Sequence, residues 1–371
     1  MRTRAGLVLL LLVTVLGGAL RLAPAGLQLG PQQQVRTRQP LAGVHTRFTD
    51  EVEAWKIQRG LTMVRDMGAT WVVEFFPWAY AEPAPGQYDW RSFDALIDRA
   101  NRQGLRVIAR LGFVPLWARV RAAGGEREAA QTTVTWLPPA LYVDFARYAT
   151  AFAARYRGRV AAVQIWNEPN LSLEWGMRPV DPEGYAAMLG VVYDAIKRAA
   201  PETIVLAGAL APTLEPAGSA NGMDDLVFLE RVYAALGEAR PWDALAVHAY
   251  GLTQQPSAPP AAEAVNFRRV ELLRAVMLRH GDTRDVHITE AGWNDAPRWP
   301  QAVTPAQRIE YTLGAWAYAG ANWPWVRSVS MWVFKLPAPA GGYRDAWTFV
   351  TPDLEPLPIY AELRAALVPP P

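Results

Sequence analysis

Eight short hydrophobic runs recur along the chain and alternate with longer amphipathic segments. Each run is only a few residues long and rich in Val, Ile, Leu and Ala, which is typical of strands buried on both faces of a parallel sheet. The last five recur at nearly equal intervals. The runs centre near Val44, Val72, Val107, Val163, Val205, Val247, Ile288 and Val329.

The segments between the runs carry apolar residues at helical spacing. Asp181-Pro182 and Thr304-Pro305 combine an N-cap residue with a first-turn proline, and Asp50 is the corresponding N-cap candidate for the first helix. Glycine follows several of the segments, as expected at helix C-termini. We therefore expect helices over residues 54–67, 92–102, 140–156, 182–199, 224–236, 262–280 and 305–319.

Strand–helix alternation repeated eight times predicts an α/β fold with a parallel sheet, either open and doubly wound or closed into a (β/α)8 TIM barrel. The first run continues as GVHTRF, where a nucleotide-binding open sheet carries a glycine-rich phosphate loop. A count of eight favours the barrel. We expect residues 41–368 to form one such catalytic domain, with mouth loops formed by the insertions at 122–136 and 252–264.

The N-terminal segment has the pattern of an export signal. Arg2 and Arg4 precede an uncharged apolar run over residues 5–20, which suits a signal peptide and is short for a membrane span. Residues 1–27 are therefore interpreted as a signal peptide or an N-terminal membrane anchor, and the polar residues 28–40 as a linker. We expect an exported protein, secreted or attached to the outer face of the cytoplasmic membrane.

Composition narrows the function classes. The 37 Lys and Arg against 35 Asp and Glu leave a net charge of +2, too little for a nucleic-acid partner. The absence of Cys excludes thiol nucleophiles and Cys-ligated zinc, and the four His form no HExxH motif, so we expect neither a metal nor a cofactor. A serine-hydrolase GxSxG elbow is also absent. Nothing predicts the oligomeric state.

Two carboxylates stand at the ends of the fourth and seventh runs. Glu168 lies in Ile-Trp-Asn-Glu-Pro-Asn and Glu290 in Ile-Thr-Glu-Ala-Gly-Trp. Catalytic groups of β/α barrels occupy the carboxyl ends of the strands, so both side chains are expected at one mouth. The proline after Glu168 favours extended backbone there. Strand alternation places Glu290 on the inward face, above Ile288.

Paired carboxylates in aromatic surroundings suit the cleavage of glycosidic bonds. One carboxylic acid protonates the leaving oxygen, and the other attacks the sugar or activates water. His248 and Tyr250, on the inward face of the sixth run, and His45 at the end of the first are candidates for binding sugar hydroxyls, with structural packing as the alternative. Sugar rings can stack on the Trp residues within or just past strand ends, which are Trp78, Trp166, Trp175, Trp293 and Trp332.

The two glutamate motifs together resemble the paired signatures of glycoside hydrolase clan A, and the chain is most similar to family 39-like and family 5-like bacterial enzymes. The resemblance spans about residues 41–364. It implies a retaining double displacement on oligo- or polysaccharides, with a preference for β-linkages, in which Glu168 is the acid/base and Glu290 the nucleophile. It also implies that Asn167 bonds the sugar 2-hydroxyl, Tyr250 holds the nucleophile and Trp332 forms the floor of the subsite.

One feature departs from the clan. Many members carry an Arg near the end of the second strand that supports the nucleophile, whereas this chain has Trp71-Val72-Val73-Glu74-Phe75. Glu74 is a third candidate carboxylate, more typical of a structural or subsite-lining residue than of a catalytic one. The absent Arg leaves an alternative open, a non-catalytic carbohydrate-binding or surface-interaction barrel that has lost turnover.

Overall fold

The computed structural model describes residues 30–370, and its centre is a closed barrel of eight parallel strands. Each strand pairs with the next along the chain, and β1 closes the ring by pairing with β8. All eight hydrophobic runs form strands, so the predicted (β/α)8 barrel is confirmed. The strands are β1 (Ala42–His45), β2 (Trp71–Pro77), β3 (Arg106–Gly112), β4 (Ala162–Ile165), β5 (Val205–Leu210), β6 (Ala244–Tyr250), β7 (Val286–Gly292) and β8 (Val326–Met331).

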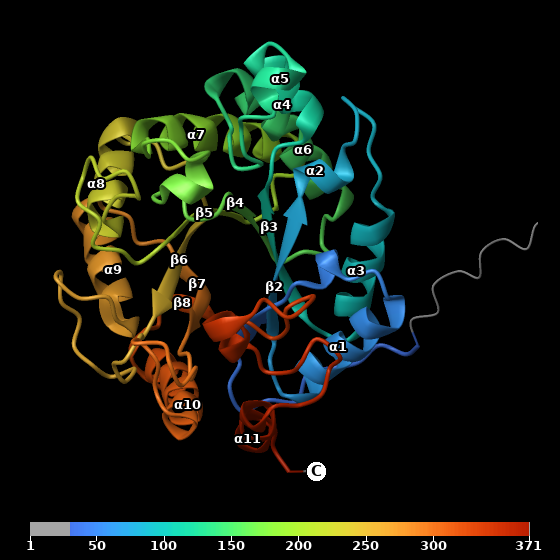
Figure 1. Ribbon diagram of the computed structural model, residues 1–371, viewed down its shortest axis with the longest axis vertical. Coiled ribbons are helices and arrows are strands. Elements are labelled where there is room, and N and C mark those ends of the chain that lie inside the picture. The colour runs from blue at the N-terminus through green and yellow to red at the C-terminus, as the bar shows by residue number, and fades with distance from the viewer. Residues whose placement is uncertain (1–29, 371) are drawn as a thin grey trace, which may run out of the picture.

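Helices surround the strands as a ring (Figure 1). Apolar faces of these helices pack against the outward side chains of the strands in one continuous core. The long helices are α1 (Ala54–Asp66), α3 (Arg91–Arg102), α6 (Tyr142–Arg155), α7 (Pro182–Ala199), α8 (Asp225–Leu236), α9 (Val270–Arg279), α10 (Pro305–Asn322) and α11 (Pro358–Leu367). The short ones are α2 (Trp78–Ala81), α4 (Leu116–Ala123) and α5 (Glu126–Ala129).

Two helix starts follow the expected capping chemistry. The Asp181 carboxylate accepts a hydrogen bond from the Gly184 amide at 2.8 Å, and Thr304 forms a capping box with Gln307. The prediction for Asp50 is wrong, because this residue ends a short 3-10 turn and pairs with Arg47 instead of capping α1.

The predicted helix over 262–280 begins only at Val270. Arg269 organises the preceding segment as a loop, because its Nη1 donates to the Ala262 carbonyl at 2.8 Å. Asn266 Nδ2 likewise donates to the Pro259 carbonyl at 2.8 Å. These side chains satisfy loop carbonyls that a helix would have bonded internally.

The barrel interior is a packed core rather than a pore. Inward side chains from β2 to β6 form one buried cluster, with Trp71, Ile108 and Leu206 as its largest members. His287 and Ser328 add a buried polar pair, joined at 2.8 Å. The packed layer closes the barrel from below, so that a cavity can open only at the carboxyl ends of the strands.

Residues 30–40 have no regular secondary structure but lie against the barrel. The Gln33 amide donates to the Arg102 carbonyl and the Arg38 amide to the Leu367 carbonyl, each at 2.8 Å. The described part of the predicted linker is therefore held at the carboxyl-terminal ends of α3 and α11. The segment 1–27, predicted to be a signal peptide or anchor, lies outside the described residues. Between residues 30 and 370, no helix is long and apolar enough to cross a membrane.

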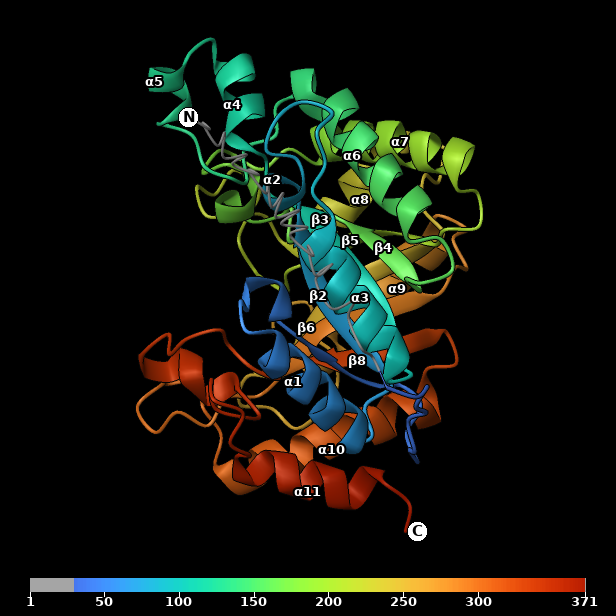
Figure 2. The ribbon, with the colours of Figure 1, turned by 90° about the vertical axis from the view of Figure 1, so that its right-hand side faces the viewer.

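Two segments project from the same side of the barrel (Figure 2). The first contains α4 and α5 and includes the insertion predicted after the third strand. The second follows β8 and contains the 3-10 helix η5 (Gly342–Trp347). Both contribute side chains to the cavity described next.

Candidate active site

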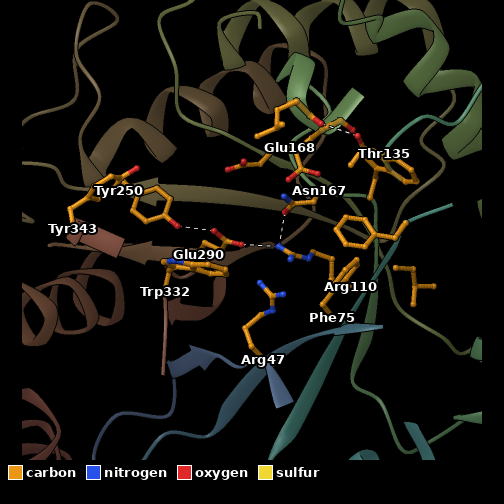
Figure 3. Close-up of a pocket in the computed structure, with 16 residues that line it drawn as sticks. Arg47, Phe75, Arg110, Thr135, Asn167, Glu168, Tyr250, Glu290, Trp332 and Tyr343 are labelled. Carbon is orange, nitrogen blue, oxygen red and sulfur yellow. Dashed lines mark hydrogen bonds and ion pairs between the residues drawn. The ribbon is translucent and has the colours of Figure 1, made fainter. Parts of the chain in front are cut away.

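A cavity of about 510 Å³ opens at the carboxyl ends of the strands. Its walls combine charged, amide and aromatic side chains from most of the strands, as Figure 3 shows. It is lined by Arg47, Phe75, Arg110, Leu111, Gly112, Phe113, Thr135, Trp166, Asn167, Glu168, Leu173, Glu174, Tyr250, Glu290, Trp332 and Tyr343.

Glu290 projects from β7 and has both carboxylate oxygens fixed. Arg110 Nη1 donates to Oε1 at 2.8 Å, and the Tyr250 hydroxyl donates to Oε2 at 2.7 Å. Only 7% of the Glu290 side chain is exposed. A buried carboxylate needs such partners, because an unpaired charge in this environment is costly. Burial and the charge of Glu290 hold the pKa of Tyr250 well above its usual range, so Tyr250 remains a donor.

Arg110 lines the cavity and was not singled out by sequence reasoning. The Arg expected near the end of the second strand is indeed absent, but Arg110 from the neighbouring strand β3 supplies a guanidinium to Glu290 and to Asn167 Oδ1, both at 2.8 Å. Its guanidinium lies 4.8 Å from the centre of the Phe75 ring. The sequence did contain a signal, because an arginine two residues after Ile108 lies on the inward face of a buried strand.

Glu168 leaves the barrel in a backbone conformation that the sequence did not predict. Strand β4 ends at Ile165, and Trp166 and Glu168 have φ values of 73° and 39° instead of extended geometry. Such left-handed residues each cost about 1–3 kcal/mol, so surrounding contacts must hold them. The Glu168 amide donates to the Ala209 carbonyl at 2.9 Å, and Trp166 Nε1 to the Glu174 carbonyl at 2.7 Å.

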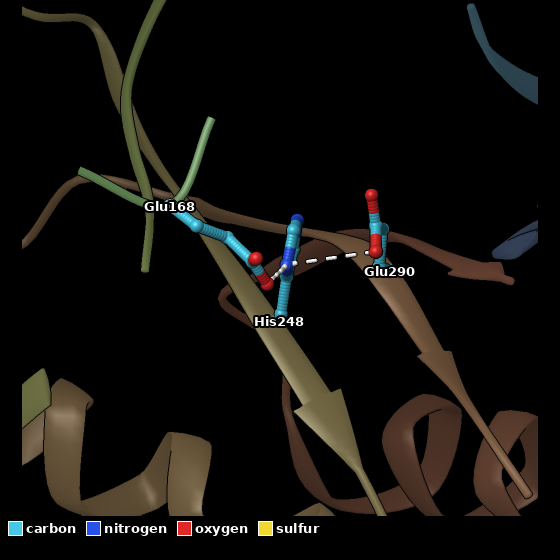
Figure 4. A group of neighbouring side chains, drawn as sticks. All are labelled: Glu168, His248 and Glu290. Atoms are coloured by element: carbon cyan, nitrogen blue, oxygen red, sulfur yellow. Dashed lines mark hydrogen bonds and ion pairs between the residues drawn. The ribbon is translucent and has the colours of Figure 1, made fainter. Parts of the chain in front are cut away.

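His248 lies between the two glutamates (Figure 4). Its Nδ1 is hydrogen bonded to Glu168 Oε1 at 2.7 Å and lies 3.7 Å from Glu290 Oε2. Burial lowers the pKa of His248, but the charge of Glu290 and the bond to Glu168 outweigh this effect, so the pKa is raised above its usual value. Carboxylate oxygens of Glu168 and Glu290 and a ring nitrogen of His248 lie within 4.8 Å of one another.

Those three side chains are also the group that could hold a metal ion within the described residues. Their existing bonds disfavour a cation, however. Both Glu290 oxygens already accept hydrogen bonds, and the guanidinium of Arg110 stands 2.8 Å from one of them. A cation bound there would also lie close to the positive charge of the Arg110 guanidinium.

Glu174 is a third carboxylate at the cavity, which sequence reasoning did not single out. It lies in the 3-10 helix η3 (Ser172–Trp175). Burial and the nearby charge of Glu168 raise the pKa of Glu174 to about 7, although Arg110 and Asn167 oppose the shift. No motif marks Glu174, which the short segment between β4 and η3 brings back to the cavity, where Trp166 Nε1 donates to its carbonyl.

Trp332 and His45, both predicted to bind substrate, lie close to each other at the cavity. Trp332 lines the cavity. His45 lies beneath it, with its ring centre 4.6 Å from that of Trp332. Burial first, and then the positive charge of Arg110, lower the pKa of His45 well below its usual value, so this ring is neutral.

Trp78 does not reach the cavity. It begins α2, is fully buried, and packs against Trp117, Phe145 and Tyr148 with a hydrogen bond from its indole to Glu82. Trp175 and Trp293 also lie outside the lining. A Trp just past a strand end can turn outward into the helix layer, which strand position alone does not reveal.

Glu74 is structural. Its side chain is fully buried and accepts hydrogen bonds from Thr46 Oγ1 at 2.7 Å and from the Phe48 amide at 2.8 Å. Burial raises its pKa. These bonds tie the segment after β1 to β2, so Glu74 holds the rim of the mouth without lining the cavity.

A sequence model of the glycoside hydrolase family 42 β-galactosidases matches residues 48–172, which include Glu168. No curated protein matches the sequence. Solved structures share the fold at low identity. The family 39 glycoside hydrolase of Bacteroides cellulosilyticus WH2 is 17% identical, with a TM-score of 0.65 over 88% of this chain. The family 39 β-xylosidase of Caulobacter crescentus is 19% identical, with a TM-score of 0.60 over 91% of this chain and 72% of its own.

The β-galactosidase from Marinomonas ef1 is 17% identical, with a TM-score of 0.58 over 87% of this chain. This chain spans only 64% of the length of the Bacteroides enzyme and 58% of the length of the Marinomonas enzyme. Likeness at this identity establishes the fold. Together with the family match, it confirms the predicted resemblance to clan A glycoside hydrolases and supports the prediction of a glycosidase.

Proposed function

We propose that the protein is a retaining glycoside hydrolase, with Glu290 as nucleophile and Glu168 as acid/base. The observation that carries this proposal is the close approach of the two carboxylates, because one oxygen of Glu168 and one of Glu290 lie within 4.8 Å of each other. Retaining enzymes have carboxyl groups about 5–5.5 Å apart, whereas inverting enzymes need roughly 6.5–9.5 Å to admit a water molecule. The short separation favours direct attack by Glu290.

In the first step, a Glu290 oxygen forms a bond to the anomeric carbon while the glycosidic C–O bond breaks. Glu168 transfers its proton to the departing oxygen, so the leaving group departs as an alcohol. Arg110 and Tyr250 hold the Glu290 carboxylate in the orientation that this attack requires.

In the second step, ionised Glu168 removes a proton from water, and the resulting oxygen displaces Glu290 from the anomeric carbon. His248 is hydrogen bonded to Glu168 at 2.7 Å and keeps the carboxyl directed toward the cavity during both steps. Asn167 is held by Arg110 at 2.8 Å and presents its amide donors to a sugar hydroxyl. The net result is hydrolysis with retention of configuration.

We propose β-linked oligo- or polysaccharides as the substrate class. The matched family model is described as β-galactosidase, and one structural neighbour is a β-xylosidase. Trp332 offers an aromatic face beside Glu290 for the apolar side of a sugar ring. The alternative of a non-catalytic barrel was based on the absence of an arginine from the end of the second strand. Because Arg110 on the third strand contacts Glu290 instead, that argument no longer applies.

Hydrolysis of 4-nitrophenyl β-D-galactoside, β-D-xyloside and β-D-glucoside tests the proposal. Glu290→Ala should lose at least about 10³-fold in kcat/KM on the best of these, because it removes the group that attacks the sugar. Glu168→Ala should lose about 10²-fold or more in kcat, because water attacks the glycosyl-enzyme without a base, whereas kcat/KM should fall less because 4-nitrophenolate leaves with little protonation. Azide should restore turnover and give the β-glycosyl azide with Glu168→Ala and the α-azide with Glu290→Ala. Glu202→Gln, an exposed carboxylate outside the cavity, is the control. Wild-type turnover by either alanine variant would contradict the proposal.

We also propose that the protein is exported through its N-terminal segment. The basic start followed by residues 5–20, an uncharged run, supports this. Expression of the full chain in a bacterium, followed by fractionation and N-terminal sequencing, would distinguish a cleaved signal peptide from a retained anchor. Export would be contradicted if the intact chain were found only in the cytoplasm.

A further inference from the structure

A second cavity, of about 330 Å³, adjoins the catalytic cavity and shares Tyr250 with it. It lies among the segments that follow β5, β6, β7 and β8, and Thr213, Trp299, Gln301 and Trp347 contribute to its lining. Because the Tyr250 hydroxyl bonds Glu290 at 2.7 Å, this second cavity begins one side chain away from the proposed nucleophile. The two cavities therefore meet at Tyr250.

Four rings form a continuous aromatic wall along this route, which we define as Tyr250, Trp347, Trp299 and Tyr343. The Tyr250 and Trp347 ring centres are 5.2 Å apart, and those of Trp347 and Trp299 are 5.8 Å apart. Trp299 and Tyr343 are stacked, with centres 5.1 Å apart and planes 10° from parallel. Tyr343 lines the catalytic cavity and is 43% exposed, so an aromatic face at the mouth remains open to solvent.

Buried polar residues hold this aromatic wall in place. Arg308 is 3% exposed and donates from Nη2 to the carbonyls of Trp347 and Thr348 at 2.7 and 3.0 Å. Asn294 is fully buried and donates to the Tyr343 carbonyl at 2.7 Å. Rings fixed in this way lose little conformational entropy when a ligand stacks on them.

We infer that the second cavity binds a further neutral sugar unit of the substrate, on the leaving-group side of the cleaved bond; this rests on the function proposed above. Aromatic faces suit the apolar side of a sugar ring, and Thr213 and Gln301 can bond its hydroxyls. No charged side chain lines this cavity in the described part of the chain, which favours a neutral sugar over a uronate or a sulfated one. β5 and β6, which lead into this cavity, both contact Glu168, the proposed acid for the leaving oxygen, through the Ala209 carbonyl and His248.

Trp299→Ala tests the inference, with Trp55→Ala as a matched control because Trp55 is 56% exposed on α1, away from both cavities. The probes are β-1,4-linked tetrasaccharides of xylose, galactose and glucose and the corresponding 4-nitrophenyl glycosides. We expect Trp299→Ala to lower the ratio of tetrasaccharide to aryl-glycoside kcat/KM about ten-fold, through a higher KM. Trp299→Phe should restore most of the ratio, and Trp55→Ala should leave it unchanged.

Calorimetric binding of the same tetrasaccharides to Glu290→Gln, with and without Trp299→Ala, gives a readout that does not depend on turnover, and thermal unfolding confirms that each variant is folded. We expect about ten-fold weaker binding when Trp299→Ala is present. Equal loss on tetrasaccharide and aryl glycoside, unchanged affinity, or no binding of any tetrasaccharide to Glu290→Gln would overturn the inference. Absence of wild-type hydrolysis together with Trp299-dependent binding would overturn the proposed function while supporting the sugar site.

Discussion

Replacement of Arg110 by Met should nearly abolish activity, because it removes the positive charge that accompanies Glu290. The change keeps an unbranched apolar side chain in β3 and deletes two hydrogen bonds of 2.8 Å, to Glu290 and to Asn167. A hydrogen bond to a charged group contributes about 1.5–3 kcal/mol. If the two bonds together contribute roughly 3 kcal/mol in the transition state, kcat/KM falls about 10²-fold, since 1.36 kcal/mol corresponds to a factor of ten.

A conservative variant separates this explanation from general damage to the fold. Arg110→Lys should lose less, about ten-fold, because it keeps the charge but cannot reproduce the planar guanidinium.

The assay is initial-rate hydrolysis, at neutral pH, of the 4-nitrophenyl glycoside that the wild type cleaves fastest. Arg106→Met is the matched control, because Arg106 lies on the same strand but over the Trp71 ring at 3.8 Å, away from the cavity. We expect the control to stay within about two-fold of wild type. A folded Arg110→Met protein that keeps a third or more of wild-type kcat/KM would refute this role for Arg110.

Three further changes give separate tests. Tyr250→Phe removes the 2.7 Å bond to Glu290 and should lower kcat about 10- to 100-fold with little change in melting temperature. The pKa of Glu174 is raised to about 7 in the folded protein, so ionising this side chain costs the folded state up to about 3 kcal/mol. The melting temperature of Glu174→Gln should therefore rise relative to that of the wild type between pH 4.5 and 7. A difference in melting temperature that stays constant over this range would contradict the prediction. Trp78→Ala should cost about 3–5 kcal/mol of unfolding free energy while KM changes less than two-fold, whereas a large KM change would assign Trp78 to substrate binding.

The barrel was predictable because its strands are short, apolar and regularly spaced, and because caps such as Asp181 depend on adjacent residues. The helix over 262–280 was placed too early, since Arg269 satisfies loop carbonyls through contacts that no local pattern records. The extended geometry expected at Glu168 was wrong for a similar reason. Tertiary hydrogen bonds such as the one from its amide to the Ala209 carbonyl outweigh the local preference before proline.

The site was only partly predictable. Both glutamates lie in recognisable motifs. Arg110 has no motif, and its only signal is that it is a charged residue within a buried strand. Glu174 approaches Glu168 only because the segment after β4 folds back. A Trp just past a strand end can line the cavity, as Trp332 does, or pack in the helix layer, as Trp78 does. Those choices are decided by packing between distant segments, which a single sequence does not display.

Covalent labelling tests the proposed double displacement most directly. Incubation with the 2,4-dinitrophenyl 2-deoxy-2-fluoro-β-D-glycosides of galactose, xylose and glucose should trap the glycosyl-enzyme, because the fluorine slows its hydrolysis. Mass spectrometry of the digested protein should then find one sugar on the peptide that contains Glu290, and none in Glu290→Gln. A label on a different residue, or turnover of the matching unfluorinated glycoside with inversion at the anomeric carbon, would contradict the account.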